Sequence, residues 1–429
     1  MINKGVFKKV TKRLDELVEE MISLEQKLTA LPAIAPENGG TGEWDKACFL
    51  REFISSLKLG EIREINAPDP RVPSGVRPNI IVTRPGRTAD RTVWIVTHMD
   101  VVPSGPRTLW QKDPFSAWVE NKRVYGRGTE DNQQDLVASI FALKACLDEG
   151  IEFPGNAGLV FVSDEETSSK YGLSYILGHK ENPFRPQDII VVPDSGNPQG
   201  TLIEIAEKSI FWLKFKTLGK QCHASVPHRG VNAFLAASHL AIELHKRLHE
   251  HFNLQNTLFH PAYSTFQPTK HEANVENVNT IPGEDTFYLD ARVLPDYNLE
   301  EVKDFVLALV AQAESAFSVK IEVEEVQRLQ APPPTKADAP VVSALSQAVY
   351  DVYGVKAKPQ GIGAGTVAAY LRRLGYSVAV WCRSDNTAHQ PNEYALIENI
   401  VGDAKVFAHL FLQEYNYSKK SGGVPEIRK

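Results

Sequence analysis

Short apolar runs alternate with amphipathic stretches in the first half of the chain. Residues 79–84 and 91–100 have the composition of buried strands. Residues 131–150 have helical periodicity and end at a glycine, the residue that commonly follows the last turn of a helix. The pattern continues with a strand at 157–166, a helix at 170–180 and a strand at 188–196. Such alternation is typical of an α/β domain built around a mostly parallel sheet.

The pattern changes near residue 208. Residues 209–221 alternate apolar and polar positions, as a strand with one solvated face does. A helix, a second alternating strand, a second helix and a third strand follow at 232–252, 285–294, 299–318 and 319–327. We therefore predict a small α+β domain of residues 208–326, inserted into a larger domain formed by residues 1–207 and 327–429.

Composition and charge narrow the classes of partner. The 429 residues carry a net charge of −6 and contain no basic block, so we expect no nucleic-acid partner and no membrane partner. The apolar runs have the length of strands and are too short to span a bilayer. Residues 1–34 have the pattern of an amphipathic helix and not of a signal peptide. The four cysteines lie far apart without a C-x-x-C pair, which favours a reduced, cytoplasmic protein.

Imidazole and carboxylate side chains gather at predicted strand ends and at one helix start. In open parallel sheets, ligands bind beyond the carboxyl ends of the strands, so polar residues there carry the most information. These residues are His98, Asp100, Asp131, Asp164, Glu165, Glu166, Asp194 and His389. Nitrogen and oxygen ligands without thiolates suit Zn²⁺, and also Co²⁺ or Mn²⁺. Two cations bridged by one carboxylate would account for the number of acidic groups.

Each of these residues also has a purely structural interpretation. Asp131 alone is most simply a helix N-cap, and Asp194 is a good turn residue. A histidine such as His98 after a strand is commonly a hydrogen-bonded structural residue. Because these interpretations would have to hold independently at four strand ends and one helix start, we favour a metal site.

Seven short motifs occur in one order along the chain. They are HMDVVP, WQKDPF, YGRGTED, SDEET, PDSG, CHAS and DNTAHQPNE. In this order they resemble the zinc peptidase and deacylase family of aminoacylase, acetylornithine deacetylase, succinyl-diaminopimelate desuccinylase and bacterial glutamate carboxypeptidase, over residues 40 to 415. The resemblance implies a zinc-exopeptidase-like catalytic domain with a mostly parallel mixed sheet. It also implies that the inserted domain is ferredoxin-like and serves as a lid and for dimerisation.

The resemblance implies a site for two divalent metal ions, most simply Zn²⁺. His98 and Asp194 correspond to ligands of one ion, and Glu166 and His389 correspond to ligands of the other. Asp131 corresponds to the carboxylate that bridges the two ions.

The resemblance also assigns catalytic roles. Asp100 corresponds to the carboxylate that orients His98, and Glu165 to the general acid and base. In this family a cis peptide often follows the bridging aspartate, which makes the Asp131–Asn132 bond a candidate. The compensating positive charge for the acidic SDEET stretch would then come from the two cations.

Further residues correspond to groups outside the metal site. His223 resembles a histidine that reaches the active site of a neighbouring subunit and stabilises the oxyanion, which implies a catalytic homodimer. Arg292 lies on the polar face of its predicted strand, where it can bind a substrate carboxylate or pair with Asp290 or Glu284. The remaining candidates for substrate binding are Asn279, Gly363, Gly365 and Thr366.

One departure from the family pattern limits the inference about substrate. Many relatives follow the bridging aspartate with a short residue and then Lys-Gly-Gly, whereas this chain has residues 132–135 as Asn-Gln-Gln-Asp. We predict a metal-dependent hydrolase of amide bonds that deacylates N-acyl amino acids, with succinyl-diaminopimelate the nearest named substrate. The alternatives are a dipeptidase or carboxypeptidase of the same family, and a catalytically inactive relative that binds a ligand.

Overall fold

Two compact units make up the protein. The computed structural model describes residues 2–415; Met1 and residues 416–429, which the predicted catalytic domain includes, lie outside the described residues. Among the described residues, the first unit contains residues 2–202, 338–358 and 377–415, and the second contains residues 203–337 and 359–376. The domain boundaries predicted at 207/208 and 326/327 stay a prediction.

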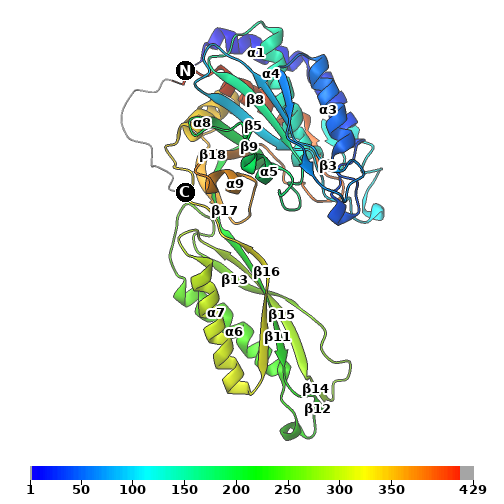
Figure 1. Cartoon of the computed structure of the whole chain (residues 1–429), viewed down its shortest axis with the longest axis vertical. Helices are drawn as coiled ribbons and strands as arrows, with labels where there is room; N and C mark the ends of the chain where they lie inside the picture. Colours follow the sequence, from blue (N-terminus) through cyan, green and yellow to red (C-terminus); the bar gives the residue numbers. More distant parts are fainter. Residues whose placement is uncertain (1, 416–429) are drawn as a thin grey trace. The chain divides into compact units, whose positions relative to one another are not determined.

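The first unit is an α/β domain built around one large sheet (Figure 1). Its helices are α1 (Lys4–Glu16), α2 (Val18–Thr29), α3 (Trp44–Ser56), α4 (Gln134–Asp148), α5 (Leu173–Gly178), α8 (Pro340–Tyr353) and α10 (Ile397–Leu412). Its main strands are β1 (Glu61–Glu64), β4 (Ile80–Arg84), β5 (Thr92–His98), β8 (Asn156–Val162), β9 (Ile189–Gly196) and β18 (Val378–Cys382). Short strands are β2 (Ala67–Pro68), β3 (Val76–Arg77), β6 (Trp118–Glu120), β7 (Arg123–Tyr125) and β19 (Tyr394–Leu396).

Those strands of this sheet that lie in the first unit follow the order β1-β4-β8-β5-β9-β18. The strands β8, β5, β9 and β18 run parallel, whereas β1 and β4 are antiparallel to their neighbours. Every residue of β5 is buried, as expected for a central strand of a parallel sheet covered on both faces. The predicted α/β domain with a mostly parallel mixed sheet is confirmed. Because the four parallel strands share one direction, their carboxyl ends meet at one edge.

The amino-terminal segment differs from the single helix that its pattern predicts. The helices α1 and α2 are separated at Leu17, where φ is −94° and ψ is 5°. Leu17 is fully buried, as are Leu14 before the break and Met21 after it. Both segments therefore bury an apolar face, although one straight helix does not form.

The second unit contains a four-stranded antiparallel sheet with two long helices along it (Figure 1). Its elements are β10 (Leu202–Glu207), β11 (Ser209–Leu218), β12 (Cys222–His223), α6 (Ala233–His251), β13 (Thr265–His271), β14 (Thr280–Ile281), β15 (Glu284–Val293), α7 (Leu299–Phe317), β16 (Lys320–Leu329), β17 (Lys358–Ile362) and α9 (Ala368–Arg373). The four strands follow the order β13-β15-β11-β16, and the chain order is strand, helix, strand, strand, helix, strand. This is the predicted ferredoxin-like arrangement.

The core of the second unit follows directly from the alternation in its sequence. Phe211, Leu213 and Phe215 of β11 are buried, and so are Phe287 and Leu289 of β15. These side chains join one apolar cluster with the buried faces of α6 and α7.

None of the helices within residues 2–415 is both long enough and apolar enough to cross a membrane.

Candidate metal centre

The register between β5 and β9 brings His98 and Asp194 together. Residues 93 and 95 of β5 pair with residues 189 and 191 of β9 in parallel. Three residues further along each strand stand His98 and Asp194, and the His98 Nε2 atom lies 3.3 Å from Oδ1 of Asp194. The sheet itself therefore places an imidazole beside a carboxylate at the strand ends.

Asp131 lies between two histidines and presents one oxygen to each. Its Oδ1 atom is 3.0 Å from Nε2 of His98, and its Oδ2 atom is 3.2 Å from Nε2 of His389. Asp131 belongs to the turn Thr129–Gln133 before α4, and the predicted cis peptide is present between Asp131 and Asn132. One carboxylate therefore faces both imidazoles through different oxygens.

Glu166 and His389 complete the cluster from the ends of β8 and β18. The Nε2 atom of His389 lies 3.0 Å from Oε2 of Glu166. His389 stands in the loop after β18 with φ at +63°, in the left-handed region. Two sets of side chains each bring their nitrogen and oxygen atoms within 4.8 Å of one another. One set is His98, Asp131 and Asp194, and the other is Asp131, Glu166 and His389. Both groups have the chemistry and proximity to hold a metal ion.

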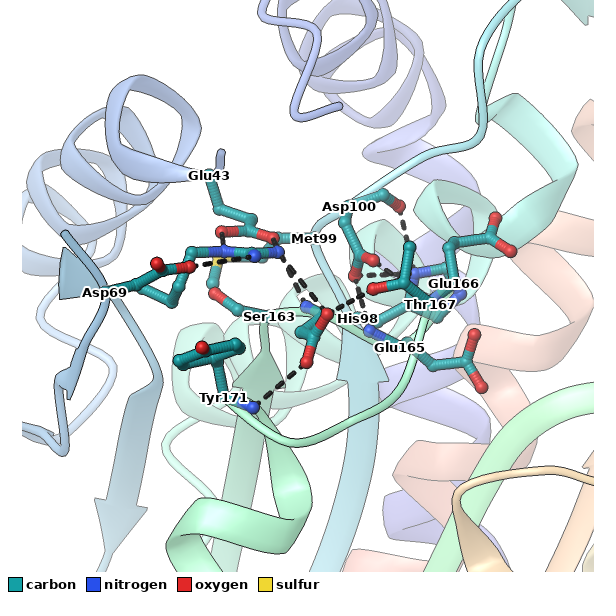
Figure 2. A network of polar contacts seen from close by, with 12 residues as sticks. Glu43, Asp69, His98, Met99, Asp100, Ser163, Glu165, Glu166, Thr167 and Tyr171 are labelled. Carbon is teal, nitrogen blue, oxygen red and sulfur yellow. Dashed lines mark hydrogen bonds and ion pairs between the residues drawn. The ribbon is translucent and has the colours of Figure 1, made fainter. Parts of the chain in front are cut away.

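Asp100 connects the ends of β5 and β8. Its carboxylate accepts hydrogen bonds from the backbone N–H of Glu165 over 3.1 Å and of Glu166 over 3.0 Å (Figure 2). The nearest acceptor for Nδ1 of His98 is the Asp100 backbone carbonyl, at 3.0 Å, with the carboxylate oxygen at 3.6 Å. Residue 100 thus contacts His98 mainly through its backbone, while its side chain holds the turn that carries Glu165 and Glu166.

The other side of that turn is anchored in a buried network of charges. Asp164 accepts hydrogen bonds from Thr167 Oγ1 and, over 3.0 Å, from the backbone N–H of Tyr171. Its own N–H donates to Glu43, which pairs with the guanidinium of Arg77. The side chains of Glu43 and Arg77 are completely buried. Figure 2 shows Glu165 and Glu166 projecting away from Glu43, so the buried charges support the turn from behind.

The segment that departs from the family pattern supports the strand end with Asp194. The Asn132 side chain donates to the carbonyl of Pro193 and lies 3.5 Å from Oδ1 of Asp194. Gln134 donates to the carbonyl of Arg383 over 3.0 Å. The amides of this segment therefore tie the helix start to β9 and to the loop after β18.

Carboxylates and imidazoles in the cluster perturb one another. Burial disfavours the charged form of His98, but its contacts with Asp100, Asp131 and Asp194 outweigh this effect and raise its pKa well above the ordinary value. Hydrogen bonds to Asp131 and Glu166 raise the pKa of His389 to about 10. Both imidazoles therefore hold a proton that a metal ion would have to displace.

The pKa of one carboxyl group in the cluster is lowered, and the pKa of two others is raised. Burial raises the pKa of Asp131, but the hydrogen bonds with His389 and His98 outweigh it and lower the pKa overall. Burial and the charge of Asp131 raise the pKa of Glu166 to about 7. Burial, followed by the charge of Asp194, raises the pKa of Glu165 well above its ordinary value. Three carboxylates so close together need a positive charge among them.

The remaining predicted residues lie in the second unit, which is described by itself. His223 and Asn279 meet where β12 pairs with β14, and the His223 Nε2 atom is 3.4 Å from Nδ2 of Asn279. Arg292 donates to both carboxylate oxygens of Asp290, over 2.7 and 3.0 Å, and to the carbonyl of Gly363 over 3.1 Å. The ion pair with Asp290 is therefore present, while the role of Arg292 in binding substrate stays a prediction.

The glycine-rich segment places Thr366 beside an acid. Its hydroxyl donates to Oε1 of Glu207 over 2.8 Å, and α9 begins two residues later. Gly365 lies next to Glu207 and Leu329. The predicted contacts of this segment with substrate stay a prediction.

Four charged residues near the cluster were missed by reasoning from the sequence: Glu43, Arg77, Glu130 and Glu393. Glu130 and Glu393 lie within the quoted motifs YGRGTED and DNTAHQPNE, so their place in those motifs was the available signal. No signal at the residue level marked Glu43 or Arg77, because nothing in the sequence pairs residues 34 positions apart.

Comparison with known proteins places this geometry among metallohydrolases. Residues 94–413 match Peptidase family M20/M25/M40. An uncharacterized metallohydrolase of Methanocaldococcus jannaschii is 41% identical over 409 residues, a match that covers 91% of this chain and 98% of that protein. A succinyl-diaminopimelate desuccinylase of Nautilia profundicola is 24% identical over 398 residues, covering 92% of this chain and all of that protein.

A solved structure shows the same fold. The human carnosine dipeptidase 1 structure matches with a TM-score of 0.71 at 18% identity, covering 95% of this chain and 98% of that chain. The predicted zinc-exopeptidase-like fold and the resemblance on which it rested are confirmed.

Proposed function

The chain belongs to Peptidase family M20/M25/M40, and from this premise we propose that it is a dinuclear amidohydrolase that releases an amino acid from an N-acyl amino acid. As a member of this family it is a metallohydrolase that acts on amide bonds. The proposal rests on one observation: the two oxygens of the Asp131 carboxylate contact different imidazoles, Oδ1 that of His98 and Oδ2 that of His389. A carboxylate shared in this way supports two adjacent cation sites.

We assign one cation to His98, Asp131 and Asp194, and the other to Asp131, Glu166 and His389. The donor chemistry of these residues fits the assignment. Nδ1 of His98 is engaged by the Asp100 carbonyl, which leaves Nε2 as the nitrogen for a metal. Each group offers one imidazole and two carboxylates, and we propose Zn²⁺ as the metal, with Co²⁺ or Mn²⁺ as substitutes.

Bound cations would lower the pKa of a water molecule and polarise the scissile carbonyl group. We assign the general base and acid to Glu165, a half-buried carboxylate that belongs to neither cation group. Its raised pKa suits a group that accepts a proton and then returns it. In this proposal Glu165 takes a proton from the attacking water and donates it to the leaving amine.

We propose a homodimer in which His223 of one copy stabilises the oxyanion in the active site of the other. The exposed position of His223 beside Asn279 supports the proposal, since both side chains are available to a second copy. Nδ1 of His223 accepts a hydrogen bond from the N–H of Ser225 over 3.1 Å, which fixes the ring orientation.

We propose that Arg292 binds the carboxylate of the substrate, together with Asn279, Gly363, Gly365 and Thr366. The planar guanidinium of arginine can bind a carboxylate through two nitrogens at once. In this protein the guanidinium of Arg292 lies over the ring of Trp212, 5.6 Å from its centre. Asp290 already occupies Nε and Nη2 of Arg292, and Nη1 donates to the carbonyl of Gly363, so a substrate carboxylate would have to displace Asp290 or share Nη1 with that carbonyl.

A dipeptidase is the second candidate, supported by the fold shared with human carnosine dipeptidase 1. A dipeptidase site must also hold a free α-amino group, whereas a deacylase site must accept an acyl group that carries no such amine. Hydrolysis of matched pairs of substrates, one N-acyl and one with a free amine, separates the two functions. Preference for the free amine would overturn the deacylase and favour the dipeptidase. The N-acyl compounds should include N-succinyl-diaminopimelate, because desuccinylases that act on it are among the relatives of this chain.

We also propose a reducing, cytoplasmic location. The four cysteines, all within residues 2–415, form no disulfide, which supports this location.

A further inference from the structure

Two buried glutamates outside the ligand set connect the loops that carry Asp131 and His389. Glu130 directly precedes Asp131, and Glu393 lies four residues after His389. The exposed fraction is 6% for Glu130 and 0% for Glu393. Buried carboxylates are costly unless hydrogen bonds satisfy them, so their partners indicate what they hold.

The carboxylate of Glu130 reaches into the loop after β18. Its Oε1 atom accepts from the backbone N–H of Asp385 over 2.6 Å. Its Oε2 atom accepts from the N–H of Ala388 over 3.0 Å, and from both the hydroxyl and the N–H of Thr387. Ala388 directly precedes His389 in the chain. Among the described residues 2–415, no ion pair compensates Glu130, so these N–H and O–H groups stabilise its charge.

The carboxylate of Glu393 reaches in the opposite direction. Its Oε1 atom accepts from the backbone N–H groups of Glu130 and Asp131, each over 3.0 Å. Its Oε2 atom accepts from the N–H of Gly128 over 3.0 Å and pairs with Arg127. Each loop therefore provides a carboxylate that binds the backbone of the other loop next to a ligand.

The loop after β18 needs such restraint more than the strand ends do. Three of its residues, Asn386, His389 and Asn392, have positive φ values of 58°, 63° and 60°, which non-glycine residues rarely adopt. His98, by contrast, is the last residue of the buried strand β5. The position of His389 therefore depends on contacts from outside its own loop.

We propose that Glu130 and Glu393 are positioning residues that form a reciprocal clasp, which sets the separation of Asp131 and His389 and thereby the affinity for the cation bound there. This inference rests on the proposed dinuclear site. The Glu130 carboxylate binds only the loop that carries His389, so replacing it should change the affinity for the cation held by Glu166 and His389. Glu393 holds the N–H of Asp131, so its effect falls on both cations.

Glutamine substitutions test the clasp without changing its shape. Both oxygens of each glutamate accept hydrogen bonds, so the amide NH₂ of Glu130→Gln or Glu393→Gln faces an N–H donor in either orientation. The matched control is Asp188→Asn. Asp188 is also buried and accepts from the N–H of Thr92 and from Trp94 Nε1, at the opposite end of β5.

The measurement is calorimetric titration of the metal-free full chain with Zn²⁺, together with thermal unfolding of each variant. We expect Glu130→Gln to weaken one of two sites by roughly 10- to 100-fold and to leave the other unchanged. Glu393→Gln should weaken both sites, and Asp188→Asn neither. Two sites of unchanged affinity in both glutamine variants would overturn the clasp.

A milder variant covers the case in which Glu130→Gln fails to fold. Thr387→Val removes one donor to Glu130 and should weaken the same single site by a smaller factor, whereas unchanged affinity would overturn the clasp. The wild-type chain separates this inference from the proposed function. Two Zn²⁺ sites without hydrolysis of any substrate would contradict the proposed function and leave the clasp standing.

Discussion

The backbone N–H of Glu166 donates to Oδ2 of Asp100 over 3.0 Å, and this bond ties the turn after β8 to the end of β5. Asp100 also accepts from the N–H of Glu165. A single side chain two residues after β5 therefore fixes the backbone of the proposed general base and of one proposed ligand. The orientation of His98 depends more on the backbone carbonyl of residue 100, which any substitution retains.

Replacing Asp100 distinguishes these two roles. In Asp100→Asn, an amide NH₂ faces one of the two N–H donors, so the turn carrying Glu165 and Glu166 should shift. We expect kcat to fall by about 10- to 100-fold, and the cation site that includes Glu166 to weaken more than the site that includes His98. Metal titration and steady-state kinetics measure both effects. Weakening confined to the His98 site would instead support an orienting role for the carboxylate.

Removing the proposed general base should separate catalysis from metal binding. Glu165 belongs to neither ligand group, so Glu165→Ala should lose turnover by about 10²- to 10⁴-fold while metal content stays at the wild-type value. Kinetics and metal analysis on the same preparation provide the test. An Ala variant with wild-type kcat would remove Glu165 from the mechanism.

Removing one terminal ligand should release one cation. His389→Ala takes away the only imidazole of its group, whereas His98, Asp131 and Asp194 keep the other group complete. We expect about half of the wild-type metal content after dialysis, because two carboxylates alone bind Zn²⁺ weakly. Retention of the full content would show that His389 is not a ligand.

Metal binding should release protons and strengthen as the pH rises. The pKa of His389 is raised to about 10, and that of His98 is also raised, so both rings are protonated at neutral pH in the metal-free protein. Each ring must lose its proton to bind a cation, and so affinity for Zn²⁺ should increase with pH up to about 10. Calorimetric titration at pH 8, in two buffers of different ionisation enthalpy, counts the protons. Binding without proton release would contradict these pKa shifts.

The buried ion pair behind the acidic turn should matter for stability. After Glu43→Gln, the carboxylates that remain within 4 Å of the completely buried Arg77 guanidinium, among the described residues, are Asp69 and Asp164, at 3.6 and 3.7 Å. We expect the free energy of unfolding to fall by about 3 kcal/mol, at the lower end of the range for a broken buried pair. Urea unfolding measures the change. Glu37→Gln, which breaks a half-exposed pair with Arg71, is the control and should have a smaller effect.

The gathering of these imidazole and carboxylate side chains could be predicted because it follows from strand direction. His98, Asp194 and Glu166 end or follow apolar runs that the sequence marks as parallel strands, and parallel strands bring their carboxyl ends to one edge. The alternation along β11 and β15 likewise predicted which face of the second unit is buried.

The supporting contacts could not be predicted in the same way. Glu130 and Glu393 bind backbone N–H groups on loops more than 250 residues away in the chain, and a glutamate in a sequence does not indicate which N–H groups its carboxylate will meet. The pairing of Glu43 with Arg77 depends on how α3 and β3 pack. The break at Leu17 is equally a matter of packing, since helical periodicity continues across it.

Metal content measured by mass spectrometry, paired with hydrolysis of a panel of N-acyl amino acids and dipeptides before and after chelation, tests the central claim most directly. The claim is that Asp131 joins two cation sites that together support hydrolysis of an amide bond. We expect two cations per chain, loss of hydrolysis on chelation and its return when Zn²⁺ is restored. A chain that binds no more than one cation even after loading with Zn²⁺ or Co²⁺ would contradict the account.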